Sequence, residues 1–288
     1  MTTGTPDISG SRTTEPVRAA GALGPAPATP TTTGEPRERD MFSLAGRTAL
    51  VTGSRTGIGR AVAVGLARAG ADVILHGHHD DLDEVEAEVR KAGRHAWRWI
   101  HDLSDTEGLP EAAATLLERH RIDILVNNAG VIRRTPAEAH SYADWRDVLT
   151  VNLDAVFLLT KAVATPMLDR RTGKIIMIAS MLSFQGGVNV PGYTAAKHAV
   201  AGLTRALACE WAARNVQVNA IAPGYIATAN TEALRADPDR EPAIRARIPA
   251  GRWGTPDDLA GAAVFLASPA ASYVNGHVLA VDGGWLAR

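Results

Sequence analysis

The chain contains the segment Thr48-Ala49-Leu50-Val51-Thr52-Gly53-Ser54-Arg55-Thr56-Gly57-Ile58-Gly59, and its architecture can be inferred from there. The first five residues form a largely apolar run, typical of a buried parallel strand. Glycines at 53, 57 and 59 follow, and then a helical pattern over residues 60–69. Such a turn forms a cradle for a dinucleotide pyrophosphate, because its backbone N–H groups can approach phosphates and the helix N-terminus favours negative charge. The candidate cofactor contacts in this cradle are Gly53, Arg55, Thr56, Gly57, Ile58 and Gly59.

The same alternation of apolar runs and helical patterns continues to the end of the chain. Further strands are expected at residues 72–76, 96–100, 122–126, 174–179, 216–221 and 276–284. Helices are expected between them at residues 82–92, 110–120, 142–168, 193–211 and 256–266. This pattern has no second break in composition. It predicts one α/β domain of Rossmann type, with a doubly wound parallel sheet of about seven strands flanked by helices.

Composition sets the domain limits and excludes several classes of partner. The 288 residues are 45% hydrophobic and 21% charged, as in ordinary soluble proteins. Residues 1–40 are rich in Thr, Pro, Gly and Ala and are expected to form a disordered tail without a catalytic role. That leaves residues 41–288 as the folded domain. Within it, the polar and Pro-interrupted residues around 228–250 are expected to form a lid over the site.

The net charge is −1 and no basic stripe is present, so no nucleic-acid partner is expected. The single cysteine, Cys209, excludes an intrachain disulfide and a Cys-based zinc site, and we expect no metal. No apolar run approaches the roughly 18 residues of a membrane span, and no secretory signal is evident. We therefore expect a cytoplasmic protein with no membrane partner.

The loop after the second expected strand, Gly77-His78-His79, bears on the choice between NAD and NADP. In dinucleotide-binding folds an acid here holds the ribose 2′-OH of NAD, whereas an arginine accommodates the 2′-phosphate of NADP. Gly77 stands in place of the acid and His78 in place of the arginine, so neither rule is met. Histidine is mostly uncharged at neutral pH, so His78 alone would bind a phosphate weakly. A solvated turn is the alternative interpretation.

Other candidate cofactor contacts follow the later strands, at the edge of the sheet where ligands bind. Asp102 could accept a hydrogen bond from the adenine amino group or cap the next helix. In Asn127-Asn128-Ala129-Gly130, small residues would let the backbone pass close to the cofactor, while the amides brace neighbouring strand ends. The contacts expected beyond the first turn are His78, Asp102, Leu103, Asn128, Ala129, Gly130, Tyr193, Lys197, Pro223, Gly224, Ile226 and Thr228.

Three side chains are expected to converge on a site for proton transfer. Ser180 ends the fifth strand, and Tyr193 and Lys197 lie four residues apart on one face of the next helix. Lowering a tyrosine pKa from about 10 to about 7 requires roughly 4 kcal/mol of preference for the phenolate. A cation about 5 Å away supplies roughly 3 kcal/mol at an effective dielectric constant near 20. Lys197 could be that cation, and Ser180 could donate a hydrogen bond to a substrate oxygen beside the phenol.

Asn152 lies inside the helix expected over residues 142–168, although asparagine has only modest helix propensity. Its side chain could mark a kink or a water site that relays protons towards Lys197. It could equally be a surface or capping amide, and the spacing alone does not separate these two interpretations.

Taken together, these motifs resemble those of the short-chain dehydrogenase/reductase family from about residue 42 to residue 288. The glycine-rich turn, the Asn-Asn-Ala-Gly segment, Asn152, Ser180, the Tyr193–Lys197 pair and Pro223-Gly224 occur in the family's order and spacing. The resemblance implies an oxidoreductase acting on CH–OH groups, with a catalytic tetrad of Asn152, Ser180, Tyr193 and Lys197. It also implies that Lys197 holds the nicotinamide ribose, that Ile226 and Thr228 meet the carboxamide end, and that the protein is a homotetramer.

Several segments resemble one group within this family, the 2-dehydro-3-deoxy-D-gluconate 5-dehydrogenases, also labelled 2-deoxy-D-gluconate 3-dehydrogenases. They are residues 178–187, 222–228, 247–254 and 281–288. The resemblance implies hydride transfer between NAD and a keto-deoxy sugar acid in the breakdown of pectin and other uronates. The Gly77-His78-His79 loop departs from the group, so NADP stays open as the cofactor.

A sugar-acid substrate carries a carboxylate, so its pocket should offer a cation. We expect Arg133 or Arg134 to bind that carboxylate and Gln185 to meet a hydroxyl, although a solvated arginine pair is equally compatible with the sequence. Another reductase of the family, such as a gluconate 5-dehydrogenase or a 3-oxoacyl reductase, is the nearest alternative function. A dinucleotide-binding regulator without catalytic activity is a more distant one.

Overall fold

Seven parallel strands form one sheet in the computed structural model, which describes Met1 and residues 40–288. The tail expected from composition falls almost entirely on residues 2–39, outside the described part of the chain. The strands are β1 (Thr48–Val51), β2 (Asp72–Gly77), β3 (Ala96–Ile100), β4 (Ile124–Asn127), β5 (Gly173–Ile178), β6 (Val216–Pro223) and β7 (Val278–Val281). Their order across the sheet is β3-β2-β1-β4-β5-β6-β7, which confirms the predicted doubly wound Rossmann architecture.

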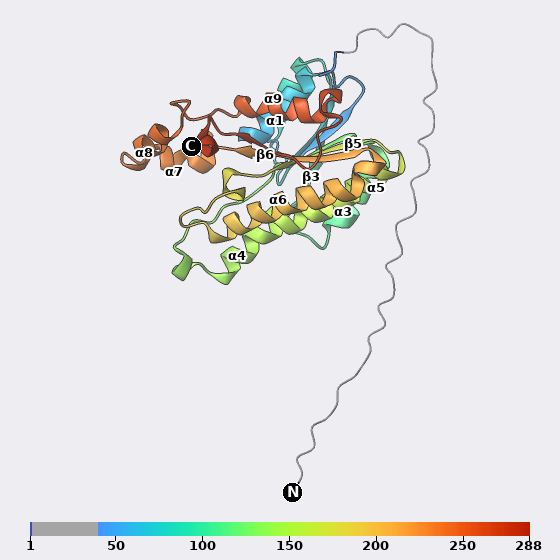
Figure 1. The fold of residues 1–288 in the computed structure, drawn as a ribbon. Helices are drawn as coiled ribbons and strands as arrows, with labels where there is room; N and C mark the ends of the chain where they lie inside the picture. Colours follow the sequence, from blue (N-terminus) through green and yellow to red (C-terminus); the bar gives the residue numbers. More distant parts are fainter. Residues whose placement is uncertain (2–39) are drawn as a thin grey trace. The chain divides into compact units, whose positions relative to one another are not determined.

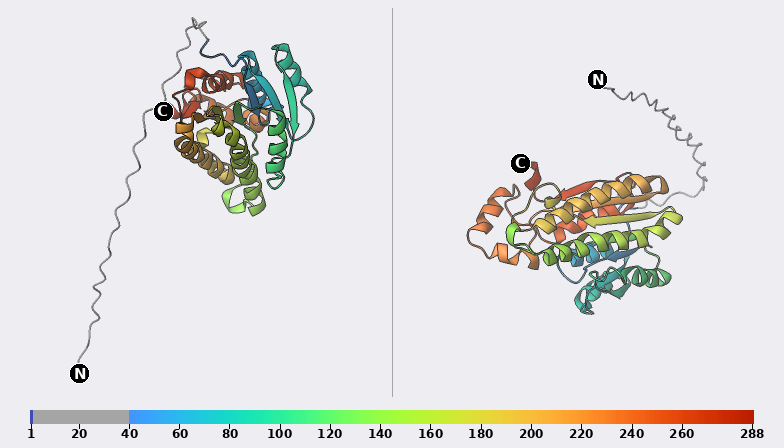
Figure 2. Two further views of the ribbon diagram at one scale, coloured as in Figure 1. Left: turned by 90° about the vertical axis from the view of Figure 1, so that its right-hand side faces the viewer. Right: turned by 90° about the horizontal axis from the view of Figure 1, so that it is seen from below.

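The helices cover both faces of this sheet (Figures 1 and 2). On one face lie α1 (Gly57–Arg68), α2 (Asp83–Lys91) and α9 (Asp257–Ala267). On the other lie α3 (Leu109–Arg119), α5 (Ala155–Asp169) and α6 (Pro191–Trp211), with α4 (Tyr142–Leu149) packed along α6. Two short helices, α7 (Glu232–Arg235) and α8 (Arg240–Arg247), extend from the carboxyl-end edge of the sheet within the lid segment, residues 228–250.

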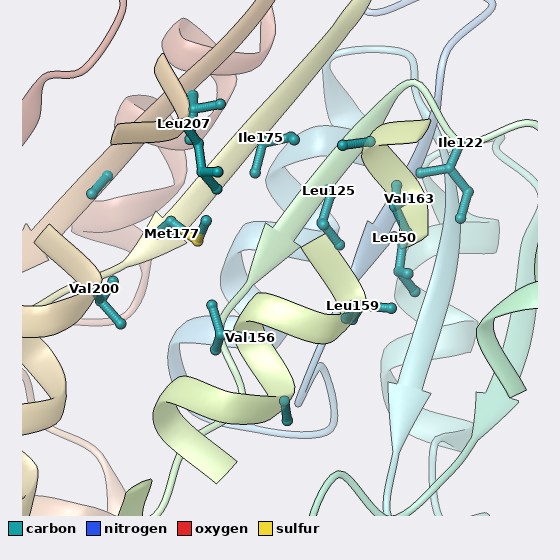
Figure 3. Packing of buried hydrophobic residues seen from close by; sticks show 14 of the residues in the cluster. Leu50, Ile122, Leu125, Val156, Leu159, Val163, Ile175, Met177, Val200 and Leu207 are labelled. Carbon is teal, nitrogen blue, oxygen red and sulfur yellow. The ribbon is translucent and has the colours of Figure 1, made fainter. Parts of the chain in front are cut away.

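Alternating side chains of each central strand enter two separate hydrophobic cores. In β5, Ile175 and Met177 face the core under α5 and α6, whereas Ile176 and Ile178 face the core under α1 and α9. Figure 3 shows the first core, where Val156, Leu159 and Val163 of α5 lie against the strands. Strands that are buried on both faces read as continuous apolar runs, which is why the sequence indicated them clearly.

The helix expected over residues 142–168 is interrupted. A π-helical turn, Thr150–Asp154, separates α4 from α5. The whole run Tyr142–Asp169 is long and apolar enough to cross a membrane by composition, with a mean hydropathy of 1.5 over its most apolar window. Half of that window is buried within the fold, because α5 packs on the sheet and against α3. Its apolar character is therefore explained by its place in the core.

The lid segment follows β6, and the residues just before and just after it are held together. Ile226 and Gly254 form a parallel bridge there, and the Gly254 N–H donates to the Tyr225 carbonyl at 2.9 Å. Ile244 and Ile248 then pack with Met181 and Trp285 in a third, smaller hydrophobic cluster. Because Met181 directly follows Ser180, this cluster brings the lid segment next to the end of β5.

Candidate functional site

A cavity of about 1160 Å³ opens at the carboxyl ends of the strands. It is lined by the glycine-rich turn after β1, the segments after β4, β5 and β6, and residues of the lid segment. All the cofactor contacts expected from the sequence line it, as do Ser180, Tyr193 and Lys197. The central crevice of the cavity lies where the strand order reverses, between β1 and β4, which is where ligands bind in sheets of this kind.

The turn after β1 has the features that a pyrophosphate requires. Gly57 has φ +56°, and a Cβ on Gly59 would collide with the Gly53 carbonyl, so both positions favour glycine. Thr56 precedes α1 without making a side-chain capping bond, and no acidic residue lies in the first turn of the helix. By contrast, α2 begins with Asp83, Glu84 and Glu86. The first N–H groups of α1 therefore face the cavity without a side-chain acceptor, and the residues fit a dinucleotide phosphate.

His76, near the end of β2, is hydrogen-bonded to this turn. The sequence alone did not single it out. Its Nδ1 accepts from the Gly53 N–H at 3.0 Å, so its Nε2 carries the proton and donates to the His101 carbonyl at 3.1 Å. The side chain is 3% exposed. Burial lowers its pKa from the ordinary 6.5 to about 4, which keeps the ring neutral. The sequence gives no local signal for this contact, because His76 and Gly53 are 23 positions apart.

The segment after β4 is tied to the same turn, as the sequence predicted for its amides. The Asn128 side chain donates to the carbonyls of Thr52 and Gly53 at 2.8 and 3.1 Å. The Thr52 hydroxyl accepts from the N–H groups of Asn128 and Ala129, both at 2.9 Å. These bonds hold the ends of β1 and β4 in fixed register around the crevice.

The far end of the cavity, where adenosine would lie, carries both signs of charge. Arg55 pairs with Asp81 at 3.1 Å, and the His78 ring lies 3.7 Å from the Asp102 carboxylate. Asp102 also accepts from the Ser104 N–H at 2.8 Å, and this bond lowers its pKa. Asp102 thus caps the turn after β3. It does not cap α3, whose N-cap is Gly108.

Ser180, Tyr193 and Lys197 converge at the near end of the cavity. Ser180 follows β5 in an extended conformation, 8% exposed, and its Oγ accepts from the Leu182 N–H at 3.1 Å. The Lys197 ammonium lies 5.5 Å from the centre of the Tyr193 ring and donates to the Ile178 carbonyl at 2.6 Å. The Ser183 hydroxyl donates to the Lys197 carbonyl at 2.6 Å, which ties α6 to the turn after β5.

The pKa of Tyr193 differs in direction from the expectation. Burial raises the pKa of the phenol, while the Ser180 hydroxyl and the charge of Arg134 lower it. Burial also lowers the pKa of Lys197 to about 8. The desolvation of the phenol therefore outweighs the Ser180 hydrogen bond and the Arg134 charge in the protein alone. Lys197 lies beside Tyr193 as expected. Its presence does not bring the pKa of the Tyr193 phenol below the ordinary value.

Asn152 lies in the π-helical turn and is fully buried, so the surface interpretation is wrong and the helix is interrupted at this residue. Its Oδ1 accepts from the Val131 N–H at 2.8 Å, and its Nδ2 donates to the Val131 carbonyl at 2.9 Å. Asn152 itself does not line the cavity, whereas Val131 does. Through these two bonds it holds the segment after β4 in place.

The structure separates the two adjacent arginines that the sequence could not distinguish. Arg133 lies outside the cavity lining and pairs with Asp147 at 2.7 Å and Asp144 at 3.8 Å. The expectation that Arg133 could bind the substrate carboxylate is therefore corrected, because its side chain lies outside the cavity. Arg134 lines the cavity and donates to the Asn230 carbonyl of the lid segment at 2.9 Å. Gln185 also lines the cavity, where its Oε1 accepts from the Trp285 indole N–H at 3.3 Å.

Four further residues of the lining were not foreseen from the sequence. Arg240 and Arg247 come from α8, and Tyr225 and Trp285 lie between them and the end of β5. These four residues lie 45 to 105 positions after Ser180, so no local sequence pattern brings them to its site. Within the described residues, no group of three or more His, Cys, Asp or Glu side chains could hold a metal ion.

Comparisons with known proteins agree with this geometry. A family model described as enoyl-(acyl carrier protein) reductase matches residues 53–286. The 2-dehydro-3-deoxy-D-gluconate 5-dehydrogenase of Bacillus subtilis is 57% identical over 249 residues, which are 86% of this chain and 98% of that protein. The gluconate 5-dehydrogenase of Gluconobacter oxydans is 45% identical, over 85% of this chain and 96% of that protein. A solved structure from Beutenbergia cavernae, described as a candidate NAD(P)-dependent gluconate 5-dehydrogenase with NADP bound at low occupancy, is 60% identical, with a TM-score of 0.84. The match covers 86% of this chain and 100% of that one.

Proposed function

The chain belongs to the short-chain dehydrogenase/reductase family, and we propose that it transfers a hydride between a nicotinamide dinucleotide and a keto-deoxy sugar acid. The activity is that of a 2-dehydro-3-deoxy-D-gluconate 5-dehydrogenase, serving uronate and pectin breakdown. One observation carries the proposal: the convergence of Ser180, Tyr193 and Lys197 in the same cavity as the phosphate cradle of α1.

Each residue of the near end has a defined task in the proposed chemistry. A bound nicotinamide ring would supply or accept the hydride at the substrate carbon. Tyr193 gives its phenolic proton to the carbonyl oxygen in reduction, and takes it from the hydroxyl in oxidation. Ser180 donates a hydrogen bond to the same oxygen and holds it beside the phenol. Lys197, fixed by the Ile178 carbonyl, stabilises the phenolate once the proton has left.

The proposed substrate class rests on the relatives and on the charge of the cavity. Four relatives named for the keto-deoxy sugar acid are 51–57% identical, and the Gluconobacter oxydans relative named for gluconate is 45% identical. The Beutenbergia cavernae structure, described as a candidate gluconate 5-dehydrogenase, is 60% identical and supports gluconate as the second candidate. Arg134, Arg240 and Arg247 line the near half of the cavity, and cations there suit a small acid. A gluconate 5-dehydrogenase would use the same charge pattern and is the second candidate. A long apolar acyl chain would have to lie against these guanidinium groups, which disfavours a 3-oxoacyl reductase.

We propose that the cofactor is NAD and that NADP is also admitted. The loop after β2 carries no acid at Gly77, His78 or His79 to repel a 2′-phosphate. Arg55 lines this end of the cavity and could turn towards a phosphate, but it pairs with Asp81. The Beutenbergia cavernae structure with bound NADP supports the wider specificity.

Replacing Asp81 tests this view of the cofactor. In Asp81→Asn, Arg55 loses its partner and its charge becomes available to the 2′-phosphate. We expect KM for NADPH to fall several-fold, because an exposed ion pair such as Arg55–Asp81 contributes at most about 1 kcal/mol. KM for NADH, which has no 2′-phosphate, should stay within about twofold. Arg55→Met should raise KM for NADPH selectively. Steady-state kinetics with both cofactors measures this. Equal changes for NADH and NADPH in either variant would show that Arg55 does not read the phosphate.

We also propose that the protein acts in the cytoplasm as a homotetramer. The family resemblance supports the assembly, and so does Phe157 of α5, a large apolar side chain that is 44% exposed. Light scattering on the purified protein would give the mass directly, and a monomer at micromolar concentration would contradict the assembly.

The experiment that tests the proposed function is a substrate panel with NADH and NADPH. The panel contains the diketo form of 2-dehydro-3-deoxy-D-gluconate, 5-keto-D-gluconate and a 3-oxoacyl thioester. We expect the highest kcat/KM for the keto-deoxy acid. A preference of tenfold or more for either other compound would replace the proposed substrate, and no turnover with any of them would refute the proposed chemistry.

A further inference from the structure

The cavity has an uneven distribution of charge. Among the described residues of its lining, the carboxylates are Asp81 and Asp102, and both lie at the adenosine end. Asp81 already pairs with Arg55 there. The opposite end, under the lid segment, presents cations from three different parts of the chain, namely Arg134, Lys197, Arg240 and Arg247. That end is therefore suited to an anion. The cofactor phosphates would lie at α1, so they do not explain the positive charge at this end.

Among the arginines of the described lining, Arg247 is the one that stacks on an aromatic ring. Its guanidinium lies over the Trp285 ring, 4.0 Å from the centre. Trp285 is itself fixed, because it is 4% exposed, donates to Gln185 and packs edge-on against Tyr225 at 4.8 Å. Stacking on an aromatic face holds a guanidinium in one plane while its N–H edge stays free for a planar carboxylate.

The neighbouring arginines are less suited to this task. Arg245, two residues earlier on α8, pairs with Glu241 at 2.9 Å. Arg240 donates its backbone N–H to the Asp237 carboxylate at 3.0 Å, and among the described residues its guanidinium, unlike that of Arg247, does not stack on an aromatic ring. Arg134 acts on the Tyr193 phenol, so it belongs to the reacting end of the cavity. Within the described part of the chain, no carboxylate lies within 4.0 Å of the Arg247 guanidinium.

We propose that Arg247, held on Trp285, binds the carboxylate of the sugar-acid substrate. The inference rests on the proposed function. In that activity the reacting carbon lies near the opposite end of the carbon chain from the carboxylate. A substrate whose carbonyl meets Tyr193 therefore needs its carboxylate bound elsewhere in the cavity, and Arg247 lines the same cavity from a different element, α8. Gln185, which shares Trp285 with Arg247, lies where it can meet a hydroxyl between the two ends.

The test compares Arg247→Met with Arg245→Met, a matched change on the same helix outside the cavity lining. Losing a charge-assisted, two-point contact should raise KM for the sugar acid on the order of tenfold to a hundredfold. KM for NADH should stay unchanged in both variants, and Arg245→Met should match the wild type with the acid. Arg247→Lys should recover part of the loss, because it restores the charge but not the planar contact.

A second substrate separates charge recognition from packing. The primary amide of the same acid lacks the negative charge, so wild type and Arg247→Met should use it with similar kcat/KM. Calorimetric titration of 2-dehydro-3-deoxy-D-gluconate into the protein with bound NADH gives affinity without turnover, and should show the same loss for Arg247→Met. Melting temperature and NADH affinity verify that the variant is folded.

The outcomes distinguish this inference from the proposed function. If wild type turns over no sugar acid, the proposed function fails. If wild type is active but Arg247→Met keeps its KM for the acid, the carboxylate is bound elsewhere and the inference is overturned. Equal losses for the acid and its amide would also overturn it, because Arg247 would then act by packing on Trp285.

Discussion

At the scale of single residues, burial and charge act against each other on the reacting phenol. Burial raises the pKa of Tyr193 and lowers that of Lys197 to about 8, so the two effects both favour the neutral forms. The sequence indicated that these side chains share one helix face, but it could not give their burial. The Ile178 carbonyl accepts from Lys197 and helps to keep the ammonium in place. The remaining stabilisation of a phenolate must come from the bound cofactor and substrate.

His76 gives a residue-scale prediction about acid stability. Its pKa is about 4 in the folded protein against an ordinary value of 6.5. The unfolded chain therefore binds more protons between these values, and the free energy of unfolding falls as the pH falls through this window. At pH 4.5 this residue should cost roughly 2 kcal/mol relative to pH 7.

The measurement is urea unfolding of wild type and His76→Gln at both pH values. The loss between pH 7 and pH 4.5 should be smaller by roughly 2 kcal/mol in the variant, which cannot titrate at this position. His198→Gln, at an exposed site on α6, should keep the wild-type dependence. Identical pH dependence in wild type and His76→Gln would contradict the assignment of a neutral, buried ring.

At the scale of elements, sequence patterns located the strands and missed one break in a helix. The run from Tyr142 to Asp169 is continuous in its apolar pattern, and the π-helical turn at Thr150–Asp154 adds a single residue to one turn. Such a turn has no compositional signature, and Asn152 within it was the one hint. Arg133 and Arg134 show a similar limit, because a loop does not reveal which of two adjacent side chains turns inward.

Asn152 gives the element-scale prediction. Its side-chain amide accepts from the Val131 N–H and donates to the Val131 carbonyl, which joins the π-helical turn to the segment after β4. In Asn152→Ala the partly buried N–H and carbonyl of Val131 lose their partners, which should cost about 1–3 kcal/mol of unfolding free energy. The segment after β4 should also loosen, so kcat should fall.

Asn275→Ala is the matched control, because the Asn275 side chain accepts from the Val218 N–H at 2.8 Å away from the cavity. It should lose stability without a comparable loss of kcat. Urea unfolding and steady-state kinetics on both variants provide the comparison. An Asn152→Ala variant with wild-type kcat would show that its link to Val131 does not position the site.

At the scale of the whole domain, the strand order decides which residues meet. The alternation of strands and helices predicted a doubly wound sheet, and this topology places the ends of β1, β4, β5 and β6 at one edge. The cradle, the Asn-Asn-Ala-Gly segment, Ser180 and Pro223-Gly224 all follow those strands, so their order in the sequence was enough to predict that they meet at one cavity. The substrate half depends on how α8 and Trp285 fold back over β5, and these contacts are fixed by packing among Ile244, Ile248 and Met181.

The central claim is that the Tyr193 phenol carries the proton in a reaction whose cofactor lies at α1. The most direct measurement is turnover of the keto-deoxy acid by Tyr193→Phe, together with its NADH affinity by calorimetry. We predict that kcat falls by about a hundredfold to ten-thousandfold, the range that general acid–base catalysis contributes. NADH affinity should stay within about threefold of wild type, because the phenyl ring keeps the shape of the site. A variant that binds NADH and retains kcat within tenfold of wild type would contradict the account.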